Sequence, residues 1–264
     1  MSNRLRDYWR GKTVLITGAS SGLGAAVTAA LAPFGVKFGL LSRREEKLQE
    51  LANRLSKSGS WFWIRACDVR RREEVFAAVN DFQKAAGRIE AAWVNSGVVA
   101  DSSFRKWKWE NYDNLIDTNL NGAIYTTMAC LQIMVPQKSG TIIGIGSAAS
   151  MRGLGARGVY SLTKIGLHYF LESMAVELPE IQFTMIHPGF VDTPINQGNP
   201  NRFWLMQPPQ AAQRMIKAVA KRKRVVIYPL PMKVLYRLTQ IVPAGLYRKV
   251  AQRAIKLSRP AKSN

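Results

Sequence analysis

The sequence predicts an α/β protein with a doubly wound parallel sheet of seven strands, helices on both faces of the sheet, and further helices at the carboxyl end. Two observations carry this prediction. Short apolar runs of strand length alternate with longer segments of helical period over the first 230 residues. No repeat interrupts the alternation, and strands that alternate with helices in this way are typical of a parallel sheet covered on both sides.

Each expected element follows from its local pattern. The apolar runs of strand length lie at residues 13–17, 37–41, 62–66, 91–95, 141–145, 182–186 and 225–227. The segments of helical period lie at residues 23–32, 43–56, 71–86, 110–135, 158–178 and 208–221. We therefore expect one large domain over residues 1–228 and a separate extension over residues 229–264.

Composition bounds the class of protein. The chain has 264 residues, of which 47% are hydrophobic and 21% charged, and this excludes a mainly disordered protein. Its two cysteines, Cys67 and Cys130, are far apart, so neither a disulfide framework nor a cysteine zinc site is expected, and two histidines predict no metal site. The first 12 residues predict no signal peptide, and no run of 18 apolar residues predicts a membrane span. A cytoplasmic protein is expected.

Positive charge is concentrated at the carboxyl end. The chain has 38 Lys and Arg against 17 Asp and Glu, a net charge of +21, which favours a polyanionic neighbour such as lipid headgroups, nucleic acid or an acidic carrier protein. Asp192 is the last acidic residue, and the 72 residues after it carry 15 Lys and Arg. The carboxyl-terminal extension therefore calls for its own explanation.

A glycine-rich turn joins the first predicted strand to the first predicted helix. Residues 17–24 read TGASSGLG. Glycines at this spacing let the backbone turn tightly and approach a pyrophosphate, which then faces the amide groups of the helix N-terminus. The residues predicted to bind a dinucleotide here are Gly18, Ser20, Ser21, Gly22, Leu23 and Gly24. A plain turn is the alternative, but the position between strand and helix favours the dinucleotide site.

With this motif the sequence resembles the short-chain dehydrogenase/reductase family, whose pattern is TGxxxGxG, and the resemblance covers residues 11–228. Further family motifs follow in order: Asp68-Val69, Asn95-Ser96-Gly97 in place of NNAG, Asn119, Ser147, Tyr160-Ser161-Leu162-Thr163-Lys164 as YxxxK, and Pro188-Gly189. Val94 and Ser96 depart from the family pattern. The resemblance implies a Rossmann-type domain, and it implies cofactor contacts by Asp68, Val69, Asn95, Gly97, Tyr160, Lys164, Pro188, Gly189, Val191 and Thr193.

The end of the second predicted strand bears on the choice of cofactor. NAD-binding proteins place a carboxylate there for the ribose 2′-hydroxyl, whereas this chain has Ser42 followed by Arg43 and Arg44. Ser42 and Glu45 have the spacing of a capping box, which would start the helix at Ser42 and put both arginines in its first turn. Cations there oppose the helix dipole unless an anion such as a 2′-phosphate meets them. NADP(H) is therefore expected, with two solvated arginines as the alternative.

Four residues are the predicted catalytic set: Asn119, Ser147, Tyr160 and Lys164. Tyr160 and Lys164 are four residues apart on a predicted helix, so their side chains share a face. An ammonium about 4 Å from the phenol would lower its pKa by at most about 3 and bring a proton donor toward neutral pH. Ser147 is expected to polarise the substrate carbonyl, and the resemblance implies that Lys164 also binds the nicotinamide ribose and that Asn119 holds a water molecule.

The same residues have structural alternatives. Ser147 and Asp68 can cap helices or turns, and Asn119 can be a buried polar residue bonded to backbone. His168 and His187 are better explained by core or interface packing. Trp107-Lys108-Trp109 is better explained by aromatic docking onto the body of the protein than by base stacking.

Two regions beyond these motifs concern substrate and surroundings. Residues 191–207 include Ile195, Phe203, Trp204, Leu205 and Met206, which form either a lid over an apolar substrate or an ordinary packed helix. Residues 233–241 and 244–257 have helical period with apolar stripes and basic opposite faces. The pair is typical of a membrane-surface element, and the alternative is that the stripes cover the protein's own core.

The sequence therefore predicts an NADP(H)-dependent oxidoreductase that interconverts an apolar aldehyde or ketone and its alcohol. The alternatives are reduction of a 3-oxoacyl group on an acidic acyl carrier protein, a non-catalytic NADP sensor, and a basic nucleic-acid-binding module, which is disfavoured because no groove-reading motif is present. The resemblance also implies a homodimer formed through residues 110–135 and 158–178. An anionic membrane surface is the expected partner of the extension.

Overall fold

Seven parallel strands form one sheet, in the order β3-β2-β1-β4-β5-β6-β7. The computed structural model describes residues 3–197 and 202–257. The strands are β1 (Thr13–Thr17), β2 (Lys37–Ser42), β3 (Trp61–Ala66), β4 (Ala91–Val94), β5 (Gly140–Ile145), β6 (Ile181–Pro188) and β7 (Val225–Tyr228). Every pair of neighbouring strands is parallel. All seven predicted strands are present, so the predicted fold class is confirmed.

The strand order reverses between β1 and β4. From β1 the chain builds outward through β2 to β3, and from β4 it builds the other way to β7. In open sheets of this type ligands bind beyond the carboxyl ends of the strands at such a switch point. Thr17 and Asn95 lie at this point, because each stands at the end of one of the two central strands.

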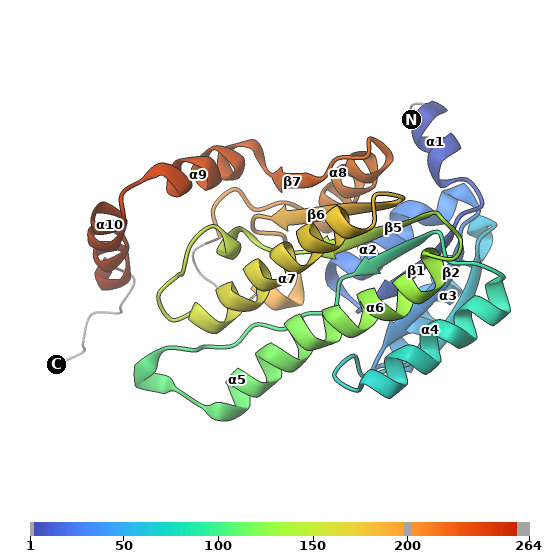
Figure 1. Ribbon diagram of the computed structural model, residues 1–264, viewed down its shortest axis with the longest axis horizontal. Coiled ribbons are helices and arrows are strands. Elements are labelled where there is room, and N and C mark those ends of the chain that lie inside the picture. Colours follow the sequence, from blue (N-terminus) through green and yellow to red (C-terminus); the bar gives the residue numbers. More distant parts are fainter. Residues whose placement is uncertain (1–2, 198–201, 258–264) are drawn as a thin grey trace.

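Helices cover both faces of the sheet (Figure 1). One face carries α2 (Gly22–Leu31), α3 (Glu45–Arg54) and α8 (Pro208–Ala220), whose apolar side chains share a core with β1 and β2. The other face carries α4 (Arg72–Ala86), α6 (Gly122–Met134) and α7 (Gly158–Glu177), which enclose a second core. The shorter α5 (Trp109–Ile116) precedes α6.

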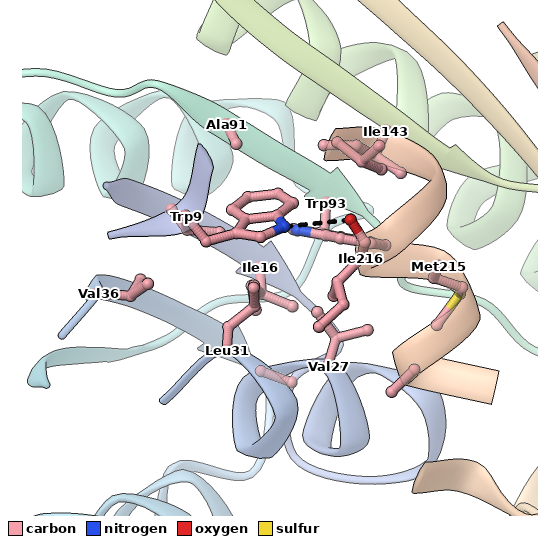
Figure 2. Packing of buried hydrophobic residues seen from close by; sticks show 14 of the residues in the cluster. Trp9, Ile16, Val27, Leu31, Val36, Ala91, Trp93, Ile143, Met215 and Ile216 are labelled. Carbon is pink, nitrogen blue, oxygen red and sulfur yellow. Dashed lines mark hydrogen bonds between the residues drawn. The ribbon is translucent and has the colours of Figure 1, made fainter. Parts of the chain in front are cut away.

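A short amino-terminal helix, α1 (Asn3–Trp9), is an element that the sequence pattern did not predict. Trp9 is fully buried, stacks on Trp93 of β4 with ring centroids 6.4 Å apart, and donates a hydrogen bond from Nε1 to the Ile216 carbonyl at 3.1 Å. Figure 2 shows this indole lying between the sheet and α8. The helix covers the core on the side of α8. It has only seven residues, which are too few to show a clear helical period in the sequence.

The predicted start of α3 at Ser42 is wrong. The helix begins at Glu45, and its N-cap is Arg44, whose backbone N–H donates to Ser42 Oγ at 3.1 Å. Glu45 does not complete a capping box, because its carboxylate accepts from the Ala66 backbone N–H at 3.2 Å. Both arginines therefore lie before the first helical turn.

The predicted helix at 110–135 contains a π-helical turn. α5 runs into a π segment at Asp117–Asn121, which leads directly into α6. A π turn holds one more residue than an α turn, and such turns are frequent at functional sites. Asn119 lies inside this segment.

The carboxyl-terminal extension forms two helices, α9 (Leu230–Ile241) and α10 (Ala244–Leu257), which project beyond the sheet (Figure 1). Met232 of α9 is buried, but Val234, Leu238 and Ile241 are exposed, and Leu246 is exposed on α10. The alternative that these stripes cover the protein's own core is therefore wrong for these side chains. Within the described residues, no helix is both long enough and apolar enough to cross a membrane.

Candidate active site at the carboxyl edge of the sheet

Most predicted site residues follow the carboxyl ends of neighbouring strands. The glycine turn follows β1, Arg43 follows β2, Asn95 follows β4, Ser147 follows β5 and Gly189 follows β6. Because all strands are parallel, the fold brings these segments to one edge of the sheet. Tyr160 and Lys164 reach the same edge from α7, and Asn119 reaches it from the π turn, as the contacts below demonstrate.

The glycine turn has the backbone conformation that its sequence predicts. Gly18 has φ of 66° and Gly22 has φ of 56°, in the left-handed region that favours glycine. A Cβ on Gly24 would collide with the Gly18 carbonyl oxygen and lie 2.7 Å from Asn95 Nδ2. These three glycines are therefore required for the turn itself and for the close seating of α2 on it.

Asn95 fixes the glycine turn from the neighbouring strand. Its Nδ2 donates to the Thr17 carbonyl at 2.9 Å and to the Gly18 carbonyl at 3.3 Å. Its backbone N–H donates to Thr17 Oγ1 at 3.1 Å. The Val94 and Ser96 departures from the family motif leave this network intact, because the bonds come from Asn95.

The N-terminus of α2 is open to an anion. Ser21 is the N-cap, and its side chain forms no capping hydrogen bond with the described part of the chain. The first turn contains no acidic residue. Because the amide groups of a first helical turn have no partner within the helix, and the dipole makes this end positive, the turn around Gly22 and Leu23 suits a phosphate group.

A guanidinium group lies directly over this turn. Arg44 Nη2 donates to Ser20 Oγ at 2.9 Å and to Ser21 Oγ at 3.0 Å. Arg43 is exposed beside it. Neither arginine forms an ion pair with a carboxylate of the described residues, although Glu45 and Glu46 are adjacent in sequence. The edge of β2 thus presents two cations without a paired carboxylate among the described residues, although the charge of Arg43 acts on Asp68 and helps to lower the pKa of that carboxyl.

Asp68 does not cap the helix that follows it, so this structural alternative is wrong. α4 begins at Arg72 with Arg71 as its N-cap, whereas the Asp68 carboxylate accepts from Arg70 Nε at 3.0 Å and from the Arg70 backbone N–H at 3.1 Å. These hydrogen bonds hold the pKa of the Asp68 carboxyl below its usual value. Val69 is buried against Gly122 at the start of α6.

Ser147 and Tyr160 come together across the loop after β5. Burial raises the pKa of Tyr160, and a hydrogen bond with Ser147 and the positive charge of Arg157 act in the opposite direction. The Ser147 hydroxyl also accepts from the Ala149 backbone N–H at 3.1 Å, so Ser147 caps a short 3-10 turn, Ala148–Ser150. The capping role given as the alternative for Ser147 is therefore present, and its predicted role of polarising a substrate carbonyl stays a prediction.

Lys164 is one helical turn from Tyr160 and fully enclosed. Its Nζ donates to the Ile145 carbonyl at 3.0 Å and lies 5.8 Å from the centre of the Tyr160 ring. A Cβ on Gly97 would be 3.3 Å from Nζ, so the glycine leaves space for the amine.

The expectation that the Lys164 charge lowers the pKa of Tyr160 is wrong for this structure. Burial lowers the pKa of Lys164 to about 8, which makes it a weaker cation, and the same burial raises the pKa of the phenol. Both effects have one cause, because an enclosed site disfavours the charged form of each group.

Asn119 is completely buried beside these groups. Its Oδ1 accepts from the Val98 backbone N–H at 2.7 Å, and its Nδ2 donates to the Val98 carbonyl at 2.9 Å. It is thus a buried polar residue bonded to backbone, as the structural alternative stated. A Cβ on Gly97 would lie 3.3 Å from Asn119 Oδ1 and also 3.3 Å from Lys164 Nζ. The Asn119 and Lys164 side chains therefore both lie beside Gly97.

The segment after β6 folds back over the glycine turn. Thr193 is buried, and its side chain would lie 3.5 Å from a Cβ on Gly22. Val191 pairs with Met206, and the Gly189 N–H donates to the Tyr228 carbonyl at 2.7 Å, which fixes both ends of the segment.

The segment at 191–207 does not form the ordinary packed helix given as an alternative, as far as it is described. Its described residues, 191–197 and 202–207, contain one 3-10 turn, Pro194–Asn196, and Phe203, Trp204 and Leu205 are exposed. The described residues form a loop, which contacts the glycine turn through Thr193. The middle of the predicted lid, residues 198–201, lies outside the described residues.

His187 contacts the candidate site, and this contact was not predicted from the sequence. It is buried, as the packing prediction stated, but its Nδ1 also lies 2.8 Å from Ser150 Oγ and 3.2 Å from the Ser147 carbonyl oxygen. A carbonyl only accepts, so Nδ1 carries the proton, and burial lowers the pKa of His187 to about 3, which keeps the ring neutral. Its place at the end of β6, beside β5 and Ser147, was the available signal.

We expect His187→Phe to lower kcat about fivefold with little change in cofactor affinity. The change keeps a planar ring but removes a hydrogen bond worth about 1 kcal/mol, so the Ser147 backbone is held less firmly. The matched control is His168→Phe, because the two rings are neighbours with centroids 4.9 Å apart, and His168 Nδ1 is buried without a hydrogen bond to the described residues. Steady-state kinetics and cofactor titration of both variants test this. Equal losses of kcat in the two variants would contradict a positioning role.

The Trp107-Lys108-Trp109 motif does not dock onto the body in the predicted way. Trp109 is 66% exposed, and the two indoles contact each other and Tyr112 edge-on or tilted. Among the described residues, no group of three or more His, Cys, Asp or Glu side chains is arranged to hold a metal ion.

Comparisons with known proteins agree with this geometry. A family profile described as short chain dehydrogenase matches residues 12–202. An uncharacterized oxidoreductase from Myxococcus xanthus is 32% identical over 246 residues, covering 92% of this chain and 97% of that relative. A short-chain dehydrogenase from Sphingobium yanoikuyae, solved in complex with NADPH, is 25% identical with a TM-score of 0.76 and covers 96% of this chain and 98% of its own.

A more distant structure shares the fold. It is a short chain dehydrogenase/reductase from Burkholderia phymatum, solved in complex with NAD, with 20% identity, a TM-score of 0.81, and coverage of 97% of this chain and 98% of its own. At this identity the likeness concerns the fold alone. The family profile spans more than half of the chain, and the Myxococcus relative covers nearly all of it. The chain therefore belongs to the short-chain dehydrogenase/reductase family of oxidoreductases.

Proposed function

We propose that this protein is an NADP(H)-dependent oxidoreductase that interconverts an apolar aldehyde or ketone and its alcohol. The observation that carries the proposal is the contact of Ser147 with Tyr160, one helical turn from buried Lys164, at the edge where the glycine turn lies. A phenol able to give a proton and a hydroxyl able to donate a hydrogen bond thus lie at the same edge of the sheet as the glycine turn. This combination suits carbonyl reduction.

The residues present fit a nicotinamide dinucleotide. The open N-terminus of α2 would hold the pyrophosphate, and Gly97 leaves room for the Lys164 and Asn119 side chains beside the site. The bound cofactor supplies or accepts the hydride. The NADPH bound by the Sphingobium relative supports the same cofactor here.

The chain's own groups handle the proton and the developing charge. The Tyr160 hydroxyl gives its proton to the substrate carbonyl oxygen, and the Ser147 hydroxyl donates a hydrogen bond to the same oxygen. Lys164 Nζ lies 5.8 Å from the centre of the Tyr160 ring, and burial lowers the pKa of its amine to about 8, so this group would supply the relay that returns a proton to Tyr160. By resemblance, Lys164 also binds the nicotinamide ribose, and Asn119 holds a water molecule in the relay.

An apolar substrate is favoured by the loop after β6. Phe190 and Phe203 pack edge-on with centroids 5.0 Å apart, and Phe203 contacts Trp204 in the same way. Arg202, the cation in the described part of this loop, forms an ion pair with Asp192, with Nη1 3.0 Å from Oδ1. The loop thus offers aromatic surface rather than a free charged anchor for a sugar or a small acid.

A screen of NADPH consumption over aldehydes, ketones, steroids and acyl thioesters tests the proposal. Turnover of apolar carbonyl compounds supports it, whereas turnover confined to acyl thioesters would favour the 3-oxoacyl reductase alternative. NADPH binding without turnover of any compound would favour the sensor. Nucleic-acid binding without NADPH binding would favour the hypothesis of a basic nucleic-acid-binding module.

We further propose a homodimer formed through α5, α6 and α7. Leu162, Tyr169 and Val176 of α7 are exposed at intervals of seven residues, so they form one apolar stripe, and Val176 is 81% exposed. A surface stripe of this kind marks an interaction site. A dimer is favoured over a tetramer because the extension lies next to the final strand.

We expect Leu162→Glu/Val176→Glu to convert a dimer into monomers. Each new carboxylate would be buried against an apolar partner surface in the dimer, which is strongly unfavourable. Light scattering at micromolar concentration measures the mass, and Lys84→Glu on α4 is the control for added negative charge. A monomeric wild type at this concentration would overturn the proposal.

The proposed location is the cytoplasm, at an anionic membrane surface. Cys67 and Cys130 are free and buried, and burial raises the pKa of their thiols to about 11 and about 12. Unpaired, protonated thiols suit a reducing compartment.

A further inference from the structure

The two helices of the extension each have one face toward the body and one apolar face toward solvent. On α9, Met232, Tyr236 and Thr239 face the body, with Met232 buried and the other two half-buried. The opposite side carries the exposed side chains Leu230, Val234, Leu235, Leu238 and Ile241, and α10 continues with Leu246 and Val250. We call these seven residues the outer apolar face. Seven exposed apolar side chains on two successive helices mark an interaction surface.

Polar contacts with the loop after β5 hold the outer apolar face in this orientation. Gln240 Nε2 donates to the Met151 carbonyl at 2.9 Å, and Arg152 Nη1 donates to the Val242 carbonyl at 2.7 Å. Tyr247 donates to the Gly153 carbonyl at 2.8 Å, and the Arg152 guanidinium lies 4.7 Å from the centre of the Tyr247 ring. The extension is therefore docked by its polar side.

Cations flank the outer apolar face. Lys233 and Arg237 lie beside it on α9, and Lys249 and Arg253 lie beside it on α10, all with exposed side chains. The sequence has no Asp or Glu after Asp192. Aliphatic side chains bordered by cations on a helix are typical of an element that lies in the interface of an anionic bilayer. A second copy of the chain would bring the same cations and be repelled, so the charge favours lipid.

Other exposed apolar side chains belong to segments that leave the sheet at the same edge. They follow the carboxyl ends of β4, β5 and β6, as the extension follows β7, and they are Phe104, Trp109, Leu154, Ile195 and Trp204. Phe104 is 95% exposed. The segment that leads to α5 and the helices α9 and α10 project toward the same end of the molecule (Figure 1). Aromatic side chains are enriched where proteins meet the bilayer interface.

We propose that the outer apolar face and its flanking cations bind the surface of an anionic bilayer, and that the enzyme takes its apolar carbonyl substrate from that bilayer. The second half rests on the proposed function. The loop bonded to the extension begins directly after Ser147, so a bound bilayer lies next to the candidate active site. A substrate that partitions into lipid then reaches the site without crossing water.

Sedimentation with vesicles tests the binding. Full-length protein should pellet with vesicles of phosphatidylglycerol and phosphatidylcholine, less so as salt rises, and little with phosphatidylcholine alone. Arg237→Gln/Lys249→Gln/Arg253→Gln should weaken binding at least tenfold. The matched control is Lys217→Gln/Lys221→Gln/Lys223→Gln, which also removes three exposed cations. These lysines lie near the end of α8 and before β7, at the opposite edge of the sheet from the extension. The control should therefore bind vesicles like wild type.

A second variant tests the apolar contribution. Val234→Ser/Leu238→Ser changes two exposed side chains, so the fold should be unaffected, and binding should again fall at least tenfold. Substitutions are preferred to truncation because Met232 is buried and its removal would disturb the body. Equal binding to neutral vesicles, or an equal loss in the charge variant and its control, would overturn the proposal.

Substrate delivery has its own readout. With a long-chain aldehyde in anionic vesicles, the charge variant should show at least a tenfold higher apparent KM, whereas a short-chain aldehyde in water should be reduced at the wild-type rate. Equal KM values for the vesicle substrate would overturn delivery. Sedimentation needs no turnover, so a failure of the proposed function appears as absent NADPH oxidation with binding unchanged.

Discussion

Tyr160→Phe should lower kcat at least a hundredfold while NADPH binds with near-native affinity. The substitution removes one hydroxyl group, the proposed proton donor, and keeps the ring in place. General acid catalysis by a positioned side chain contributes about 10²- to 10⁴-fold, or about 3–5 kcal/mol of barrier. Because Tyr160 is partly enclosed and its pKa is raised, the hydroxyl stays protonated at neutral pH and is able to donate. Steady-state kinetics on a substrate from the screen, with NADPH titration by fluorescence, measure both quantities.

The matched control is Tyr125→Phe, which removes a phenol hydroxyl from α6, away from Ser147. Its kcat should equal that of wild type. Full activity of Tyr160→Phe on a confirmed substrate would contradict the mechanism. A loss of NADPH affinity equal to the loss of kcat would instead assign Tyr160 to binding.

Wild type should bind NADPH at least tenfold more tightly than NADH, and Arg43→Asp should abolish that preference. Arg43 is an exposed cation at the end of β2, and Arg44 lies over the glycine turn, where a 2′-phosphate on the adenosine ribose would meet both. Charge-assisted bonds of guanidinium groups to phosphate are worth about 1.5–3 kcal/mol each, and a carboxylate would repel the phosphate and accept the 2′-hydroxyl of NADH instead. Titration of both cofactors against both proteins measures the ratio.

Arg54→Asp makes the same change in charge at the carboxyl end of α3, the helix that follows Arg43 and Arg44, and serves as the control. It should keep the wild-type preference, because Arg54 is at the far end from the turn. A wild-type preference for NADH would show that the two arginines have been assigned wrongly.

The strands and most helices could be predicted because burial sets their patterns locally. β1 and β6 are buried along their whole length, so each appears as a short run rich in apolar residues, although β6 also holds Gln182, Thr184 and His187. The order of the site motifs along the chain was equally informative, because parallel topology converts sequence order into a shared edge. Gly18, Asn95 and Ser147 lie at one edge of the sheet for this reason.

What could not be predicted depends on contacts between segments that are distant in sequence. Glu45 has the right spacing for a capping box with Ser42, yet it bonds the neighbouring strand at Ala66. Trp9 forms a helix because α8 and β4 enclose its indole. The protonation of Tyr160 depends on how deeply the site is buried, and spacing alone says nothing about solvent. Tertiary packing decided each of these cases.

The π turn at Asp117–Asn121 lets the chain position Asn119 without changing how the long helix packs on the sheet. A π turn is equivalent to the insertion of one residue into an α-helix. Because the extra residue is taken up within one turn, deleting it would restore regular α-helix and leave the buried faces of α5 and α6 in their common register. The turn is therefore not needed for packing the helices on the sheet. What it adds is local, because the wide turn lets the Asn119 amide face inward and bond both backbone groups of Val98.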